Sequence, residues 1–327
     1  MLRKAVLSCM AVVASLSTTV ATGVLTGGVV AWAIAAQQAQ ADWGPQNPND
    51  DQRNTYYVTG NVTDDWSTLQ SENQADNTTY FIRADSSGSG NTATMSKVTI
   101  GANDPLIITG HWNNTSARFE ALTITQLEAN EGSTLQVGGS QGTASEQNVT
   151  ILSQTGTLSS LRVAAQANLT LGDGTNASTF AANAVTVEEG GNLTIATGST
   201  LDLTSFTPPN QQAAAFLQPL TSSAITTEEG AFIKIKLGNG DQNREITFNG
   251  ALNNNFEFDS AFTFHGNGAN QYVVTLGSDV VLKSDHDMRV VSQGTFTVDG
   301  GTLELGAQIQ LGHELSLIHI SEPTRQE

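Results

Sequence analysis

The residues best suited to catalysis form a few short acidic groups. Asp285-His286-Asp287 is the densest titratable cluster, and Glu188-Glu189 and Glu228-Glu229 are paired carboxylates of the type that serves glycoside hydrolysis. A carboxylate beside an imidazole can orient a general base or bind a metal ion, but neighbouring residues on a strand point to opposite faces of a sheet. Both glutamate pairs lead into glycine, so we interpret them as exposed turns.

Nucleophile and metal-binding motifs are incomplete in this sequence. Gly139-Ser140-Gln141-Gly142 and the serine-rich segment 86–90 lack the flanking pattern of a nucleophile elbow. Gly172-Asp173-Gly174 and Gly238-Asn239-Gly240-Asp241 are similar to calcium-binding turns, but the tandem nonapeptide repeat of such sites is missing, and we expect tight turns with positive φ. The sequence therefore predicts no catalytic, cofactor-binding or metal-binding residue, and no enzymatic activity.

Short strands must position any of these residues. From about Lys97, the chain repeats a triplet in which two apolar residues flank one polar or small residue. The triplets are 98–100, 122–124, 135–137, 149–151, 161–163, 169–171, 185–187, 193–195, 201–203, 233–235, 296–298 and 303–305. Alternation with period two, rich in β-branched residues, indicates strands of about three to five residues with one buried and one solvated face.

The spacing of the triplets indicates a solenoid. The triplets that begin at Val185, Leu193 and Leu201 are spaced evenly along the chain, and three such strands close a coil of roughly 20–24 residues. An immunoglobulin-like sandwich has longer strands and hairpin signals instead. The sequence thus predicts an all-β fold of stacked coils, in which each coil buries its inner face against the next.

Asparagine recurs at one position of this repeat. Asn148, Asn168 and Asn192 each precede an apolar triplet by one residue. In stacked coils the same position recurs along the axis, so we expect these side chains to form a hydrogen-bonded ladder. The three sites also match the N-glycosylation acceptor pattern, as does Asn61-Val62-Thr63, but the repeat explains them as structural residues.

Composition excludes several classes of partner. The 327 residues contain 13 Lys and Arg against 31 Asp and Glu, and the formal net charge is −18. Nucleic acid and anionic membrane surfaces are therefore poor partners. Charged residues make up 13% of the chain, unlike the Glu- and Lys-rich composition of disordered chains.

The first 41 residues have the order of a secretory signal peptide. Arg3 and Lys4 precede a long apolar stretch that ends in Ala39-Gln40-Ala41, and no acidic residue occurs before Asp42. The alternative is an uncleaved membrane anchor. The single cysteine, Cys9, lies within this segment, so we expect an exported mature chain without disulfides and without a membrane-spanning helix.

Some units of the repeat resemble a known family. Glu188-Glu189-Gly190-Gly191-Asn192-Leu193-Thr194-Ile195 and Asp299-Gly300-Gly301-Thr302-Leu303-Glu304-Leu305-Gly306 are similar to the Gly-Gly-Thr-Leu-x-Leu repeats of bacterial autotransporter passenger domains. The likeness spans residues 97–306. It implies a right-handed parallel β-helix that is secreted through the outer membrane by a type V route. The expected location is the cell surface, as part of an outer-membrane protein, or the extracellular medium.

The C-terminal end departs from that family. Autotransporters end in a translocating outer-membrane barrel, and this chain contains no such segment. Residues 315–325 match the in-frame translation of a transposase-type sequencing adapter. We therefore expect residues 315–327 to be a non-native tail, in which His319 and Glu322 have no function, and the barrel to be missing from this sequence.

The remaining segments complete the predicted organisation. Residues 42–96 are richer in aromatic side chains and are interpreted as an N-terminal cap with the first coils. Residues 97–314 form the β-helix, with a projecting loop at 204–223 in which residues 211–217 form one helical turn. Six phenylalanines are interpreted as stacked core aromatics rather than a ligand site: Phe232, Phe248, Phe256, Phe258, Phe262 and Phe264.

These features favour a non-enzymatic surface protein. The predicted outer faces carry Thr, Asn and acidic side chains, which suit weak multivalent contact with glycans or host surface proteins. We expect an adhesin or a structural stalk. The alternatives are a polysaccharide lyase or hydrolase on the same scaffold, which needs a groove of clustered acidic and basic groups, and a surface-layer structural protein, which self-assembles.

Overall fold

The computed structural model describes residues 55–58, 62–64, 79–84, 91–110, 117–139, 146–206, 213–237, 244–246, 250–265, 272–291 and 294–311. All of them belong to one compact unit, Ala39–Glu327. The predicted signal peptide, most of the predicted cap, the adapter-like tail, Phe248 and the segments 86–90, 140–142 and 238–241 lie outside the described residues.

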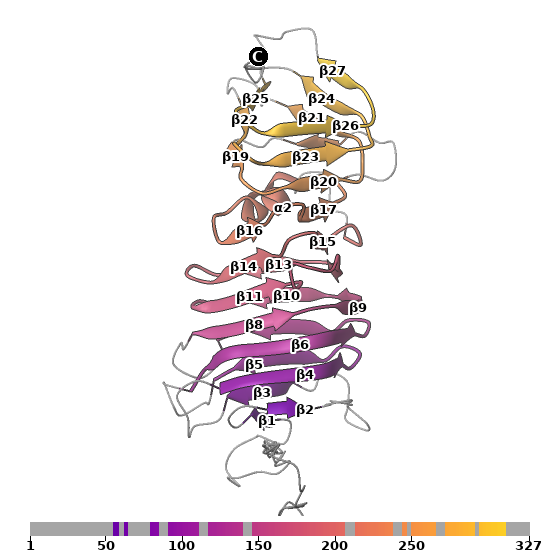
Figure 1. Cartoon of the computed structure of the whole chain (residues 1–327). Coiled ribbons are helices and arrows are strands. Elements are labelled where there is room, and N and C mark those ends of the chain that lie inside the picture. The colour runs from indigo at the N-terminus through magenta and orange to yellow at the C-terminus, as the bar shows by residue number, and fades with distance from the viewer. Residues whose placement is uncertain are drawn as a thin grey trace, which may run out of the picture. The chain divides into compact units, whose positions relative to one another are not determined.

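The described residues form a parallel β-solenoid. Every strand pairing recorded among them is parallel. Figure 1 shows the strands stacked in the order of the sequence, from indigo to yellow. Each predicted triplet lies in or overlaps a strand, which confirms the all-β prediction of stacked coils. The parallel pairing excludes a sandwich of antiparallel hairpins.

The N-terminal coils build two columns of strands, which we name sheets A and B. Sheet A contains β1 (Thr55–Val58), β3 (Tyr80–Ala84), β5 (Pro105–Thr109), β7 (Thr134–Val137), β10 (Ser160–Val163) and β13 (Val185–Val187). Sheet B contains β2 (Val62–Asp64), β4 (Asn91–Ile100), β6 (Phe119–Ala129), β8 (Gln147–Ile151), β11 (Ala167–Leu171), β14 (Asn192–Ile195) and β16 (Ile225–Thr227).

A third column, sheet C, branches from β6 and continues to the last coil. It contains β9 (Gln154–Leu158), β12 (Thr179–Ala182), β15 (Thr200–Asp202), β17 (Phe232–Ile235), β20 (Phe256–Phe258), β23 (Val281–Ser284) and β26 (Thr302–Leu305). In the later coils it is joined by sheet D, with β18 (Arg244–Ile246), β21 (Phe262–His265), β24 (Met288–Val291) and β27 (Ile309–Leu311). Sheet E contains β19 (Gly250–Leu252), β22 (Tyr272–Leu276) and β25 (Gly294–Val298).

In the middle of the chain one coil contributes one strand to each of sheets A, B and C. β13, β14 and β15 contain the three evenly spaced triplets and lie in sheets A, B and C respectively, as the spacing predicted. The coil length varies more than expected. Asn168 pairs in register with Asn148, 20 residues earlier, whereas Ile225 pairs with Leu193, 32 residues earlier, because that coil also contains a helix.

Two strands are longer than the predicted three to five residues. β4 has 10 residues and β6 has 11. β6 pairs with β8 through one part of its length and with β9 through another, so a single extended segment serves both sheet B and sheet C. The alternation of apolar residues does not reveal such a long strand. The same alternation is expected for one continuous strand and for two short strands separated by a bend.

The core is a stack of apolar side chains that point inward from each strand. Leu169 pairs in register with Val149 on one side and with Leu193 on the other, and all three are buried. Each fully buried aliphatic side chain of this kind contributes roughly 1.5–3 kcal/mol. Because a single coil cannot enclose its own inner face, this burial requires neighbouring coils.

Aromatic side chains fill the core of the later coils. Phe256, Phe258, Phe262 and Phe264 are buried, and the rings of Phe258 and Phe262 meet edge to face at 4.4 Å between centroids. These four confirm the interpretation as core aromatics. Phe232 is different, because it is half-buried at the start of its strand and its ring lies 3.7 Å from the Lys283 ammonium.

A short helix interrupts the columns. α2 (Ala213–Leu220) lies within the segment predicted as a projecting loop, and it contacts β13 of sheet A and β18 of sheet D. Leu217 and Leu220 are buried. The buried Asn254 amide donates to the Leu220 carbonyl at 2.9 Å, and its oxygen accepts from the Thr227 backbone. The helix is therefore anchored to the coil that follows it.

Candidate functional site

The paired glutamates lie in turns, as predicted. Glu189, Glu228 and Glu229 are exposed, and Gly190 has a φ of 83°, a left-handed conformation that favours glycine. The first glutamate of each pair bonds to the preceding coil. Glu188 accepts from the Ala165 backbone at 3.1 Å, and Glu228 accepts from the Thr197 backbone at 2.9 Å.

This equivalence assigns the first glutamates a structural role. Glu188 and Glu228 occupy the same position relative to the preceding coil. The Glu188 backbone N–H donates to the Val163 carbonyl, and the Glu228 backbone N–H donates to the Ile195 carbonyl. Arg162 also pairs with the Glu188 carboxylate. These hydrogen bonds, first from Arg162 and then from the Ala165 backbone, lower the pKa of Glu188. The carboxylates of Glu188 and Glu228 therefore connect successive turns.

Gly172-Asp173-Gly174 forms a tight turn. Both glycines have positive φ, 101° and 72°, which confirms the predicted conformation. The Asp173 carboxylate accepts hydrogen bonds from the backbone of Asn176 and Thr175 and from the Asn176 amide, and these bonds hold the pKa of Asp173 well below its usual range. The carboxylate oxygens are thus used within their own loop.

Asp285-His286-Asp287 lies in the connection between β23 and β24, whereas the sequence pattern led us to expect a strand there. The His286 backbone donates to Ser284 Oγ at 3.1 Å, and that hydroxyl donates to the Phe258 carbonyl of the preceding coil at 2.9 Å. Asp287 accepts from the Gln308 backbone. The bend places Asp285 and His286 at the rim of a pocket, whereas Asp287 faces the following coil.

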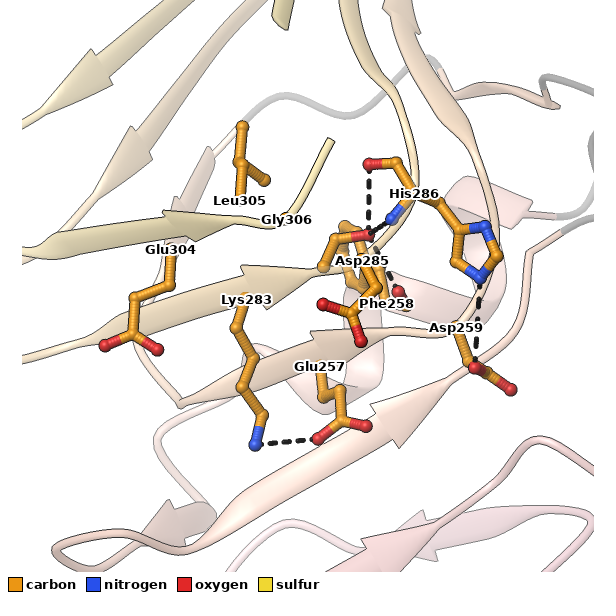
Figure 2. A pocket seen from close by; sticks show the side chains of 10 residues that line it. Glu257, Phe258, Asp259, Lys283, Asp285, His286, Glu304, Leu305 and Gly306 are labelled. Carbon is orange, nitrogen blue, oxygen red and sulfur yellow. Dashed lines mark hydrogen bonds and ion pairs between the residues drawn. The ribbon is translucent and has the colours of Figure 1, made fainter. Parts of the chain in front are cut away.

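Asp285 and His286 border a concave pocket on the later coils. It has a volume of about 470 Å³ and is lined by Glu257, Phe258, Asp259, Lys283, Ser284, Asp285, His286, Glu304, Leu305 and Gly306. Figure 2 shows that these residues come from the ends of three stacked strands and from the turns that follow them. The pocket is open to solvent and rich in carboxylates.

Two lysines are bound to one carboxylate in this region. Glu257 Oε2 lies 2.8 Å from Lys283 Nζ, and Glu257 Oε1 lies 3.0 Å from Lys234 Nζ. Burial raises the pKa of Glu257, but the hydrogen bonds from Lys283 and Lys234 outweigh it and the net direction is downward. The hydrogen bond to Glu257 raises the pKa of Lys234. Glu257 is therefore an ionised clamp and not a proton donor at neutral pH.

The clamp belongs to a longer alternation of charge on the outer face of sheet C. In register, Asp202 pairs with Lys234, Lys234 with Glu257, Glu257 with Lys283, and Lys283 with Glu304. Opposite charges on adjacent strands attract one another and specify the register. We name these five residues the charge ladder.

The other groups of the pocket are less tightly engaged. His286 Nε2 lies 4.0 Å from Asp259 Oδ1, and Asp285 lies beside Gly306 of the next coil, where an added Cβ would meet its carboxylate. No group of three or more potential metal ligands is found in the residues that the structure covers. The carboxylates of Asp259, Asp285 and Glu304 can accept hydrogen bonds from hydroxyl or ammonium groups that enter the pocket.

The sequence indicated Asp285 and His286 only as part of a dense titratable cluster, and it did not associate Glu257, Asp259 and Glu304 with them. The signal for two of them was present, because Phe256-Glu257-Phe258 and Leu303-Glu304-Leu305 carry a charged residue at the centre of an apolar triplet, as Leu282-Lys283-Ser284 nearly does. Only the coil spacing brings these three centres together. That spacing is irregular in this chain, so the pairing was not readable from the triplets.

Comparison with protein-family models, with curated proteins and with solved structures finds no match for this chain. Among the residues described, no helix has the length and apolar character required to cross a membrane.

Proposed function

We propose that this chain is the exported passenger region of a bacterial surface protein, and that its solenoid acts as an adhesin or a structural stalk rather than as an enzyme. The proposed location is the cell surface or the extracellular medium. The sequence features that support it are the N-terminal signal-like segment, the acidic composition and the similarity of the repeat to autotransporter passengers.

The observation that carries the proposal is the register of the coils. Inward residues stack into a closed apolar core, while outward residues repeat the same polar types from coil to coil. In such an array each coil contacts its neighbours, so added coils extend the molecule without a new fold. Repeated outward side chains also present many equivalent weak contacts, which is the requirement for multivalent attachment.

Adherence provides the direct test. The purified chain should bind neutral or host-type glycans on an array, or should attach to host cells, and antibodies against it should label intact bacteria that express the full gene. Absence of glycan binding and of cell attachment, together with a hydrolytic or lyase activity, would contradict the proposal.

The pocket of Figure 2 supports a second candidate, a polysaccharide-cleaving enzyme on the same scaffold. Its acids are accompanied by His286 and Lys283, which the dispersed basic residues of the sequence did not suggest. If this candidate is right, the chain should depolymerise a polysaccharide, and His286→Gln should remove that activity while Glu229→Gln, in an exposed turn, should leave it intact.

A further inference from the structure

The outer face of sheet B carries a column of threonines, to which the proposed function assigns no specific ligand. Thr94 pairs in register with Thr123, Thr123 with Thr150, Thr150 with Thr170, Thr170 with Thr194, and Thr194 with Thr226. Six successive coils therefore place the same side chain at the same position. Strands separate by about 4.8 Å, so the column extends about 24 Å.

A second column runs beside the first. Asn148, Asn168 and Asn192 lie two residues before Thr150, Thr170 and Thr194, on the same face of their strands. Two residues along a strand span about 6.6 Å. The two columns thus form a two-dimensional lattice of polar groups, with one repeat set by the coil and the other by the strand. We name this lattice the Thr/Asn face.

The lattice is held rigidly. The Asn168 amide donates to Asn148 Oδ1 at 2.8 Å, and the Asn192 amide donates to Asn168 Oδ1 at 2.8 Å. The inward neighbours of each rung, such as Leu169 and Leu171, are buried in the core. Each threonine has a β-branched side chain with a restricted χ1 angle. Both columns therefore have little freedom to move from their repeat.

The hydroxyl groups of the threonine column are available. Within the described residues, none of the six makes a side-chain hydrogen bond to another protein group, and Thr94 and Thr226 are exposed while the other four are partly exposed. Neither column contains a charged or aromatic residue, although the chain has a net charge of −18. The Thr/Asn face is thus a neutral surface on an acidic protein.

We propose that the Thr/Asn face is an ice-binding surface, which adsorbs to the ordered water at the face of an ice crystal. A crystal lattice of water has fixed repeats in two directions, and hexagonal ice has repeats close to those of the two columns on its prism face. Hydroxyls and amides can replace water molecules at such positions, and the threonine methyl groups fill the spaces between them. Rigidity avoids an entropic cost on binding.

Charge and shape favour ice over other occupants. A neutral face complements an uncharged crystal surface, whereas anionic glycans and membranes are repelled by the acidic chain. An aromatic side chain gives a sugar ring a large apolar surface on which to stack, and neither column supplies one. The Thr/Asn face offers a lattice match in place of such a platform.

The test is inhibition of ice recrystallisation by the purified full-length chain, with a matched pair of variants. Thr170→Tyr places a bulky ring at the centre of the Thr/Asn face. Thr179→Tyr places the same ring at an exposed position of sheet C. Tyrosine suits a strand position, so both variants should fold, and far-ultraviolet circular dichroism and thermal unfolding verify this.

We expect the unmodified chain to slow ice recrystallisation and Thr179→Tyr to do so equally well. Thr170→Tyr should need about tenfold more protein for the same effect, as expected for a bulky change at the centre of an interface. Lack of any effect of the unmodified chain on ice, or equal activity of the two folded variants, would overturn the proposal. Neutral glycan binding that Thr170→Tyr removes, without an effect on ice, would assign the face to glycans instead.

Discussion

Asn168 links three coils through its side chain. It donates to Asn148 and accepts from Asn192, and both hydrogen bonds are 2.8 Å long. The ladder was predictable because Asn occurs at the same point of three apolar triplets. The grouping of the carboxylates around the pocket was not predictable, because it depends on turns whose lengths differ between coils.

Removing the central amide should therefore weaken the stack. Asn168→Ala loses two side-chain hydrogen bonds, each with a net contribution of roughly 0.5–1.5 kcal/mol, so the free energy of unfolding in urea should fall by about 1–3 kcal/mol. Asn130→Ala, at an exposed position outside the ladder, is the matched control. Equal stability of the two variants would show that the ladder does not support the fold.

Glu257 should make part of the stability depend on pH. Its pKa is lower in the folded chain than its ordinary value of 4.5, so its contribution is present above 4.5 and is lost as pH falls through the folded-state pKa. The pKa of Lys234 is raised above 10.5, so its contribution is present below 10.5 and is lost as pH rises through the folded-state value.

Glu257→Gln should remove the first effect and reduce the second, because Asp259 and Asp202 still act on Lys234. Lys234 and Lys283 then lose their shared carboxylate, and the free energy of unfolding at neutral pH should fall by about 1 kcal/mol. On acidification below 4.5 the variant should lose less stability than the unmodified chain. Denaturant titrations at several pH values measure this, with Glu229→Gln as the control. If the free energy of unfolding falls equally below pH 4.5 in the variant and in the unmodified chain, the proposed role of Glu257 is wrong.

Individual elements were predicted with unequal success. The strands that contain Leu122, Leu169 and Leu193 were readable, because alternation with period two reports local backbone geometry. α2 was expected as one helical turn in a projecting loop, but its eight residues are anchored by buried leucines. Its burial arises from contacts with β13 and β18, which are distant in the sequence.

The aromatic elements of the later coils give a stability test. Phe258→Ala removes a buried ring that contacts Phe256 and Phe262, and it should lower the free energy of unfolding by about 3–5 kcal/mol. Phe206→Ala, at a ring that is 39% exposed, should cost much less. Thermal unfolding followed by circular dichroism compares the two variants. If Phe258→Ala does not fold, the less drastic substitution Phe258→Leu tests the same contacts. A larger loss at Phe206 would contradict the assigned core.

At the scale of the whole molecule, the described coils follow one rule. The residue at the centre of each triplet faces outward, so one column becomes the Thr/Asn face and another becomes the charge ladder. Sequence identified the outward residues individually. It did not show which of them align, since the aligned pairs on these two surfaces lie between 20 and 32 residues apart along the chain. Only the register of the strands shows which residues align, and this register makes the Thr/Asn face and the charge ladder regular.

Engineered disulfides test that register most directly. In a Cys9→Ala background, which removes the one native cysteine, cysteines at Thr170 and Thr194 occupy paired positions on adjacent strands. Their Cα atoms should lie about 4.8 Å apart, within disulfide range. Cysteines at Thr150 and Thr194 lie two coils apart, at about 10 Å, beyond that range. The stacked register predicts rapid intramolecular oxidation of the first pair and none of the second; equal oxidation of both pairs, or oxidation of the second pair alone, would contradict it.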